Sequence, residues 1–378
     1  MRIGIDARFY GSIGKGLGRY TQRLVEHLEE IDTENSYYIF LRRENFDEYQ
    51  PKNANFKKVL ADYAWYSFAE QFFFPALLFS FKLDLMHFPH FNVPILYFKR
   101  FIITIHDLIL LHFPTKRAST LQPLVYWIKF RAYKLVIFLG IVRSEKIITV
   151  SQFTKNDILS QYNVDEKKIV VTSEACGEFE IEKAITPAQI LEKYAIIKPY
   201  LLYVGNAYPH KNLEKLIAAF CEICKEKKDL SLVLVGKDDY FYDRLKQQVE
   251  ENKIANVIFP GFIDDLHLNA VYAQAELYVF PSLYEGFGLP PLEAMKNGSA
   301  VVSSDSTCLP EILGDAAYFV DTSDEDKIAT GVLAVLSDDN LRKKLIEKGY
   351  LQVGKYDWKV MAKETLAVYQ NAIKKKQT

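Results

Sequence analysis

Two glutamates and the glycines between them are the strongest candidate for a chemical site. They lie in the stretch FPSLYEGFGLPPLEA at residues 280–294, which predicts a strand ending at Phe280, a loop, and a helix with proline in its first turn. Amides at such a helix start favour a phosphate, and those concerned here belong to Gly286, Phe287, Gly288 and Leu289. Glu285 and Glu293 flank that position, and carboxylates accept hydrogen bonds from vicinal hydroxyls. The spacing therefore fits a diphosphate with a sugar on one side and a ribose on the other.

A lysine and a histidine follow two other predicted strands. Lys211 lies in YVGNAYPHKNL at residues 203–213, and it can supply the positive charge that a leaving diphosphate requires. His106 follows the apolar run at residues 101–105, where a polar group is usually either structurally satisfied or catalytic. A structural role stays open for each residue alone, because Glu285 could support a helix start and Glu293 or Lys211 could be solvated. The two glutamates together with their loop favour the functional interpretation.

Three further patterns are weaker. The glycines from Gly14 to Gly18 predict a loop, in which Gly16 and Gly18 would let backbone approach a ligand, but they match neither a P-loop nor a dinucleotide fingerprint. Cys221 and Cys224 follow helical spacing, so Cys224 is expected in the core, and zinc would need two more ligands. The acidic triplet at 324–326 is expected to cap a helix. We expect no metal site.

Two series of short apolar runs alternate with helical patterns, which predicts two parallel sheets. The first series comprises residues 2–5, 37–41, 85–88, 102–105, 147–150 and 169–172. The second comprises residues 200–204, 230–235, 257–259, 277–280, 300–303 and 318–319. The mixed, polar stretch at residues 176–198 is expected to hold the domain boundary. The predicted fold is α/β, with two doubly wound domains facing across a cleft that takes the ligand.

The composition is that of a globular protein. A chain of 378 residues suggests two domains, and its 49% apolar residues can fill two cores. Lys and Arg number 47 against 48 Asp and Glu, and this net charge of −1 argues against a nucleic-acid-binding protein. Four cysteines and a start without an apolar leader predict a cytoplasmic location. No apolar run approaches the ~20 residues that cross a bilayer.

Charge and aromatic residues concentrate in one region of the first half. Residues 60–155 hold 11 basic and 5 acidic side chains, and 14 of the 39 residues from 63 to 101 are Phe, Tyr or Trp. A basic and aromatic surface suits contact with an anionic membrane, at the inner face of which the protein would then act. The alternative is that these rings fill the core of the first domain. The sequence leaves both open.

Taken together, these residues resemble the retaining glycosyltransferases of family 4, which have the GT-B fold, and more closely their mannosyltransferase-like branch. The resemblance covers nearly the whole chain, and its most specific element is the Glu-x7-Glu motif of Glu285 and Glu293. The supporting motifs are GLGRY at 16–20, TIHDL at 104–108, VSQFTK at 150–155, PHKNL at 209–213, LPE at 309–311 and GDAA at 314–317.

The resemblance implies a role for each matching residue. Glu285 would contact the donor sugar, Glu293 the ribose and Lys211 the diphosphate, while His106 would face the reacting sugar from the first domain. Phe262 and Ile263 look like the family's loop near the base. Many members carry arginine where this chain has Asn206, so the second cation at the phosphates is left open. The implied division is an acceptor-side domain at 1–180, a donor domain at 181–357, and a helix at 358–378 crossing back.

The implied reaction moves a hexosyl group, with GDP-mannose the expected donor, to a hydroxyl of a glycan or lipid-linked acceptor. Configuration would be retained, and no metal or other cofactor would be needed if Lys211 and the helix start neutralise the diphosphate. Two alternatives remain open: a sugar-nucleotide epimerase of the same architecture, and a non-catalytic protein that binds sugar nucleotide.

Overall fold

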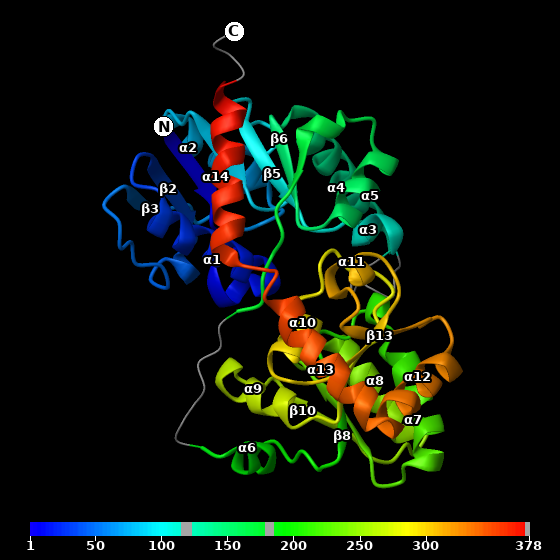
Figure 1. The fold of residues 1–378 in the computed structure, drawn as a ribbon. Helices are drawn as coiled ribbons and strands as arrows, with labels where there is room; N and C mark the ends of the chain where they lie inside the picture. The colour runs from blue at the N-terminus through cyan, green and yellow to red at the C-terminus, as the bar shows by residue number, and fades with distance from the viewer. Residues whose placement is uncertain (115–122, 178–184, 375–378) are drawn as a thin grey trace. The chain divides into compact units, whose positions relative to one another are not determined.

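The computed structural model describes residues 1–114, 123–177 and 185–374. The chain forms two compact units, of which the first comprises Met1–Glu174 with Asp357–Thr378 and the second Ala175–Tyr356 (Figure 1). Each unit is a parallel sheet covered by helices, as predicted. In the described ranges no helix is both long and apolar enough to span a bilayer.

The first unit is built on a seven-stranded sheet in the order β3-β2-β1-β4-β5-β6-β7, in which every neighbouring pair is parallel. Its strands are β1 (Arg2–Asp6), β2 (Ser36–Leu41), β3 (Phe56–Leu60), β4 (Leu85–Phe88), β5 (Phe101–Ile105), β6 (Lys146–Thr149) and β7 (Ile169–Val171). The central strands β4 and β5 are buried at every residue, which a sheet covered on both faces requires. The sequence did not predict β3, an edge strand that carries Lys57 and Lys58.

The helices of the first unit are α1 (Lys15–Ile31), α2 (Phe68–Ser80), α3 (Ile109–His112), α4 (Pro123–Arg143), α5 (Gln152–Gln161) and α14 (Trp358–Lys374). The last of these, α14, packs beside α1 (Figure 1). Right-handed crossovers from β3 to β4 and from β5 to β6 put α2 and α4 on the opposite face from α1. Side chains of α2, α4 and α5 accordingly share one core cluster.

The predicted glycine loop at residues 14–18 is wrong in its extent. A short 3-10 turn covers Gly11–Gly14, and α1 begins at Lys15, so Gly16 and Gly18 lie in the first turn of a helix. A Cβ at Gly18 would lie 2.1 Å from the carbonyl oxygen of Gly11, whereas one at Gly16 would meet nothing within 4 Å. The close packing of α1 against the preceding turn explains Gly18 without a ligand.

The second unit is built on a six-stranded parallel sheet in the order β10-β9-β8-β11-β12-β13. Its strands are β8 (Tyr200–Val204), β9 (Ser231–Val235), β10 (Val257–Gly261), β11 (Leu277–Phe280), β12 (Val301–Ser304) and β13 (Ala317–Val320). Its helices are α6 (Pro187–Lys193), α7 (Leu213–Glu226), α8 (Tyr240–Glu251), α9 (Asp265–Ala273), α10 (Leu289–Lys296), α11 (Leu309–Leu313), α12 (Glu325–Ser337) and α13 (Asp339–Val353). Asp324 caps α12 by accepting from the Asp326 amide, which confirms the predicted cap.

Candidate functional site

Lys211 and Glu285 form an ion pair in the second unit. Lys211 ends a 3-10 turn, Pro209–Lys211, in the loop after β8, and Glu285 lies in the loop after β11. Since β8 and β11 are parallel neighbours, both loops leave the same carboxyl edge of the sheet. The Lys211 Nζ lies 2.5 Å from the Glu285 Oε1, and the side chains are 13% and 10% exposed. Two predicted site residues, far apart in sequence, therefore meet at a partly buried position.

Hydrogen bonds to backbone carbonyls hold the two loops together. The Leu283 amide donates to the carbonyl oxygen of His210 at 2.8 Å. The Asn212 side-chain amide donates to the carbonyl oxygens of Pro281, at 3.3 Å, and Thr322, at 2.7 Å. Asn212 has a φ of 61°, a left-handed conformation that asparagine tolerates. These bonds fix the loops against each other, so the ion pair sits on a rigid base.

The helix start between the two glutamates has the predicted geometry. Gly288 adopts a φ of 94° directly before α10, and proline occupies the first turn of that helix. A Cβ at Gly288 would also come within 2.8 Å of the Leu309 Cδ2, so both conformation and space require glycine. No side chain caps this helix start among the described residues. The Glu285 amide donates to the Thr307 Oγ1 at 3.2 Å, which orients the loop.

Glu293 lies inside α10 and is 5% exposed, so the alternative that it is a solvated helical residue is wrong. The Tyr272 hydroxyl from α9 donates to its Oε2 at 3.2 Å. A buried carboxylate held by a hydroxyl is a ready acceptor for further hydroxyl donors. Glu285, which is 7% exposed, is likewise no solvated surface acid.

The remaining predicted donor residues lie around the same sheet. Asn206 follows β8, and its side-chain oxygen accepts from the Tyr208 amide at 3.3 Å. After β10, Phe262 is 69% exposed whereas Ile263 is buried. The exposed ring of Phe262 is available to contact a planar group, and Ile263 anchors the loop beneath it.

His106 lies in the first unit, directly after β5. Its Nδ1 lies 2.9 Å from the Glu174 Oε1, and its Nε2 donates to the carbonyl oxygen of Pro89 at 3.0 Å. The Tyr20 ring packs edge-on against the imidazole, with centroids 4.7 Å apart. Burial favours the neutral ring, but the hydrogen bond and charge of Glu174 outweigh it and raise the pKa of His106. Sequence reasoning missed Glu174, although it follows β7 as His106 follows β5.

Two other histidines are structural. His87 is buried and pairs through Nδ1 with the Tyr369 hydroxyl, at 2.8 Å, and through Nε2 with the Thr104 Oγ1, at 2.9 Å. Burial lowers the pKa of His87 to about 3, so this ring is neutral and ties β4 to α14. His112 pairs with Asp157 at 2.8 Å.

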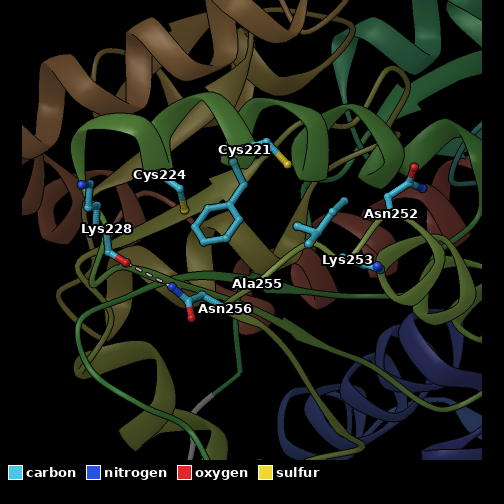
Figure 2. A pocket seen from close by; sticks show the side chains of 9 residues that line it. Cys221, Cys224, Lys228, Asn252, Lys253, Ala255 and Asn256 are labelled. Atoms are coloured by element: carbon cyan, nitrogen blue, oxygen red, sulfur yellow. Dashed lines mark hydrogen bonds between the residues drawn. The ribbon is translucent and has the colours of Figure 1, made fainter.

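A pocket of about 370 Å³ lies at the amino ends of β9 and β10, whereas Lys211 and Glu285 follow the carboxyl ends of their strands (Figure 2). It is lined by Phe220, Cys221, Cys224, Lys228, Asn252, Lys253, Ile254, Ala255 and Asn256. Cys224 is only partly buried there, so its predicted place in the core is wrong. Burial raises the pKa of the Cys221 and Cys224 thiols, which makes them poor nucleophiles. The described ranges contain no cluster of three or more metal-ligating side chains.

Two family models match the chain, one in each unit. The model described as Glycosyltransferase Family 4 matches residues 14–174, and the model described as Glycosyl transferases group 1 matches residues 190–352. Fold and matches together define a glycosyltransferase of GT-B architecture. The chain belongs to the family 4 glycosyltransferases, as the motifs predicted.

Curated relatives agree with this assignment. O-antigen chain mannosyltransferase B of Escherichia coli is 36% identical over 230 residues, which are 59% of this chain and 60% of that protein. Phosphatidyl-myo-inositol mannosyltransferase of Mycolicibacterium smegmatis is 27% identical over 251 residues, 64% of this chain and 62% of that protein. The matched segments thus span less than two thirds of these relatives.

Solved structures share the fold over nearly the full length. Sucrose-phosphate synthase from Thermosynechococcus elongatus superposes with a TM-score of 0.76 at 19% identity, covering 98% of both chains. Anabaena HepE, in complex with UDP and glucose, superposes with a TM-score of 0.74 at 12% identity, covering 98% of this chain and 99% of that one. At these identities the likeness establishes the GT-B fold.

Proposed function

We propose that the protein transfers a hexosyl group from a nucleoside diphosphate sugar to a hydroxyl of a glycan or lipid-linked acceptor, with retention of configuration. The observation that carries this proposal is the Lys211–Glu285 pair beside the start of α10. GDP-mannose is the proposed donor, because the curated relatives include enzymes named as mannosyltransferases. Binding of UDP and glucose by the structural neighbour HepE supports a nucleotide sugar as the donor class.

The geometry suggests how the donor is held. Its diphosphate would draw the Lys211 ammonium away from Glu285 and lie against the amides at the start of α10, where the helix dipole favours negative charge. Glu285 would then accept hydrogen bonds from the sugar, and Glu293 from the ribose. Negative charge builds on the departing phosphate in the transition state, so a preorganised cation and amides lower the barrier. On this account the reaction needs no metal or cofactor.

Product analysis tests the proposed reaction. The protein is incubated with GDP-mannose, first alone and then with glycan or lipid-linked acceptors, and the products are separated and their anomeric configuration is read by NMR. Transfer to the acceptor with an α-linkage is the expected result. Epimerised nucleotide sugar formed without acceptor would instead identify an epimerase. Donor binding without turnover on any acceptor would identify a non-catalytic binding protein.

Helix α2 supports a proposed contact with a membrane, because its outward face is apolar. Glu70, Phe74 and Leu78 point into the unit and are buried. The side chains that face outward are Phe68, Phe72, Phe73 and Phe79, and Phe68 is 86% exposed. A contiguous exposed apolar face of this kind marks an interaction surface. Only part of the aromatic residues therefore fills the core.

The apolar face continues from α2 to α4. Phe79 stacks on Tyr97, with ring centroids 5.5 Å apart, and Arg143 at the end of α4 donates to the carbonyl oxygens of Ile95 and Tyr97. Exposed apolar side chains lie on the same segments: Leu96 and Phe98 flank Tyr97, and α4 exposes Leu135, Phe138 and Val142. We call this surface of α2, residues 96–98 and α4 the aromatic patch.

Exposed cations accompany the aromatic patch: Lys82, Lys99, Lys129, Arg131 and Lys134. None of them has an acidic partner in the part of the chain that the structure describes. Apolar rings among unpaired cations complement a bilayer with anionic head groups, where each cation contributes about 1 kcal/mol. We therefore assign the aromatic patch to an anionic membrane surface, which would bring the enzyme to a lipid-linked acceptor.

Phosphatidylglycerol vesicles should sediment the protein at low salt and release it as salt screens the cations. The double variant Phe72→Ser with Phe73→Ser should lose most of this binding, and its fold should persist because both rings are exposed. Leu351→Ser, which changes a 74% exposed side chain in the second unit, is the matched control and should bind as the wild type does. Equal sedimentation of all three proteins would refute the assignment.

A further inference from the structure

Both ring nitrogens of His106 are committed to acceptors within the first unit. The Pro89 carbonyl oxygen, 3.0 Å from Nε2, can only accept, so Nε2 carries a proton. The Glu174 Oε1 lies 2.9 Å from Nδ1, and an ionised carboxylate also can only accept. In a neutral imidazole protonated at Nε2, the lone pair of Nδ1 would therefore face a lone pair of the Glu174 Oε1. The geometry requires a proton between Nδ1 and Glu174.

The geometry points to Glu174 as a positioning residue that holds His106 as an imidazolium, so that His106 acts on the substrate as a fixed positive charge and not as a proton acceptor. Its relevance to catalysis rests on the proposed function and on the role at the reacting sugar that the family resemblance implies for His106. The charge state itself can be measured without any turnover.

The groups around His106 are compatible with one positive charge there. Glu174 approaches from the end of β7, with its side chain 8% exposed, and Asp107 is the next residue in the chain. Tyr20 from α1 presents its ring, and its own hydroxyl lies 3.2 Å from the Thr104 Oγ1. His87 lies in β4 and His90 follows that strand. Burial mainly, and the charge of His106 in second place, lowers the pKa of each to about 3. The neighbouring histidines are thus neutral.

The ring is also fixed in orientation. The Thr154 hydroxyl donates to the carbonyl oxygen of His106 at 3.1 Å, and Thr154 is itself bonded to Ser151 at the start of α5. The backbone of His106, its two ring nitrogens and its contact with Tyr20 are all fixed. The ring therefore cannot rotate to accept a proton from a substrate. This arrangement suits a permanent charge better than an acid–base catalyst, whose nitrogen must reach the substrate.

Nitrogen-detected NMR of the histidine rings in the isotope-labelled full chain tests the inference, with the His106 signals assigned from their loss in His106→Gln. The wild-type ring should remain doubly protonated through neutral pH. In Glu174→Gln, which keeps the shape and removes the charge, the pKa of His106 should fall by about 1–3 pH units. Activity of this variant should fall as pH rises through the lowered pKa, a profile that the wild type lacks at those pH values.

Asp157→Asn is the matched control, since it removes the carboxylate that pairs with His112, a different histidine of the same unit. It should leave the titration of His106 unchanged. Glu174→Asp keeps the charge, so its His106 ring should stay doubly protonated. This variant also tests the inference if Glu174→Gln folds poorly. A neutral His106 ring in the wild type at pH 7, or an unchanged titration in Glu174→Gln, would overturn the inference. A shifted ring in a protein that turns over no donor would instead reject the proposed function alone.

Discussion

Replacing Glu285 by glutamine should slow hexosyl transfer by a factor of about 10²–10³, which corresponds to about 3–4 kcal/mol of barrier. The carboxylate is 7% exposed and lies 2.5 Å from the Lys211 ammonium. Glutamine keeps the size but removes the charge that pairs with Lys211 and that we propose accepts hydrogen bonds from the sugar hydroxyls. Initial rates at saturating GDP-mannose measure the effect, and the loss should appear in kcat because the contact tightens in the transition state.

Glu325→Gln provides the control for this substitution. Glu325 pairs with Lys215 at 3.1 Å in the same unit, but the two side chains are 46% and 39% exposed. Such a surface pair contributes little, so transfer by this variant should equal that of the wild type. Undiminished transfer by Glu285→Gln would remove Glu285 from the reaction.

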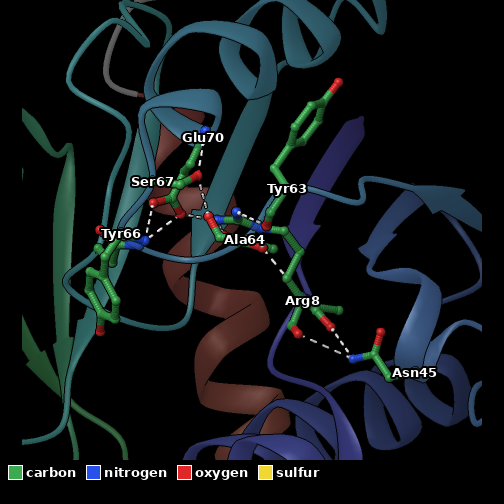
Figure 3. A network of polar contacts seen from close by, with 10 residues as sticks. Arg8, Asn45, Tyr63, Ala64, Tyr66, Ser67 and Glu70 are labelled. Carbon is green, nitrogen blue, oxygen red and sulfur yellow. Dashed lines mark hydrogen bonds and ion pairs between the residues drawn. The ribbon is translucent and has the colours of Figure 1, made fainter.

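The largest expected effect on stability is that of Arg8→Met, which should lower the free energy of unfolding of the first unit by about 3–5 kcal/mol. Arg8 is fully buried just beyond β1, and its guanidinium lies 2.7 Å from the carboxylates of both Asp6 and Glu70. Figure 3 shows the side of this network that Arg8 and Glu70 form. Burial alone would lower the pKa of Arg8, but the charges of Asp6 and Glu70 raise it above its ordinary value. Methionine keeps the stem and leaves two buried carboxylates without their cation.

The same network holds the loop that leads into α2. Arg8 also donates to the carbonyl oxygen of Tyr63, and Glu70 accepts from the Tyr66 amide at 2.8 Å (Figure 3). Tyr66 has a φ of 58°, a strained conformation for a tyrosine that these bonds must maintain. Loss of Arg8 should therefore loosen this loop as well as expose two charges to an apolar surrounding.

Urea unfolding followed by tryptophan fluorescence measures the change in the first unit, because all three tryptophans, Trp65, Trp127 and Trp358, lie in it. Arg23→Met is the control, since the Arg23–Glu26 pair is about one third exposed. That substitution should change the midpoint little. A midpoint in Arg8→Met as high as in Arg23→Met would show that the buried network does not stabilise the unit.

Most strands were predictable because a strand buried on both faces of its sheet is a short, continuous apolar run in the sequence. Strands such as β8 and β11 are apolar throughout and end at loops, and their observed bounds are the predicted ones. The edge strand β3 was missed because Lys57 and Lys58 interrupt its apolar pattern. The glycine loop before α1 was misjudged because glycine allows both a loop and the close packing seen at Gly18.

The sequence indicates which residues belong to the candidate site, but it does not indicate which of them contact one another. The glycine-started helix and its two glutamates could be read from one continuous stretch, and Gly288 and the prolines have the expected places. The ion pair of Lys211 with Glu285 joins residues 74 positions apart, and no local pattern indicates which charges will meet. Glu174 was missed for the same reason, since it lies 68 positions from His106.

Titration of nucleoside diphosphate sugars into the protein tests the central claim most directly. Among a panel of donors, GDP-mannose should bind and raise the unfolding temperature, because a ligand at about 100 times its Kd stabilises the folded state by about 2.7 kcal/mol. Lys211→Met should weaken that binding at least tenfold, since it removes the cation proposed to neutralise the diphosphate. Equal affinity of wild type and variant, or no stabilisation by any nucleotide sugar, would contradict the account.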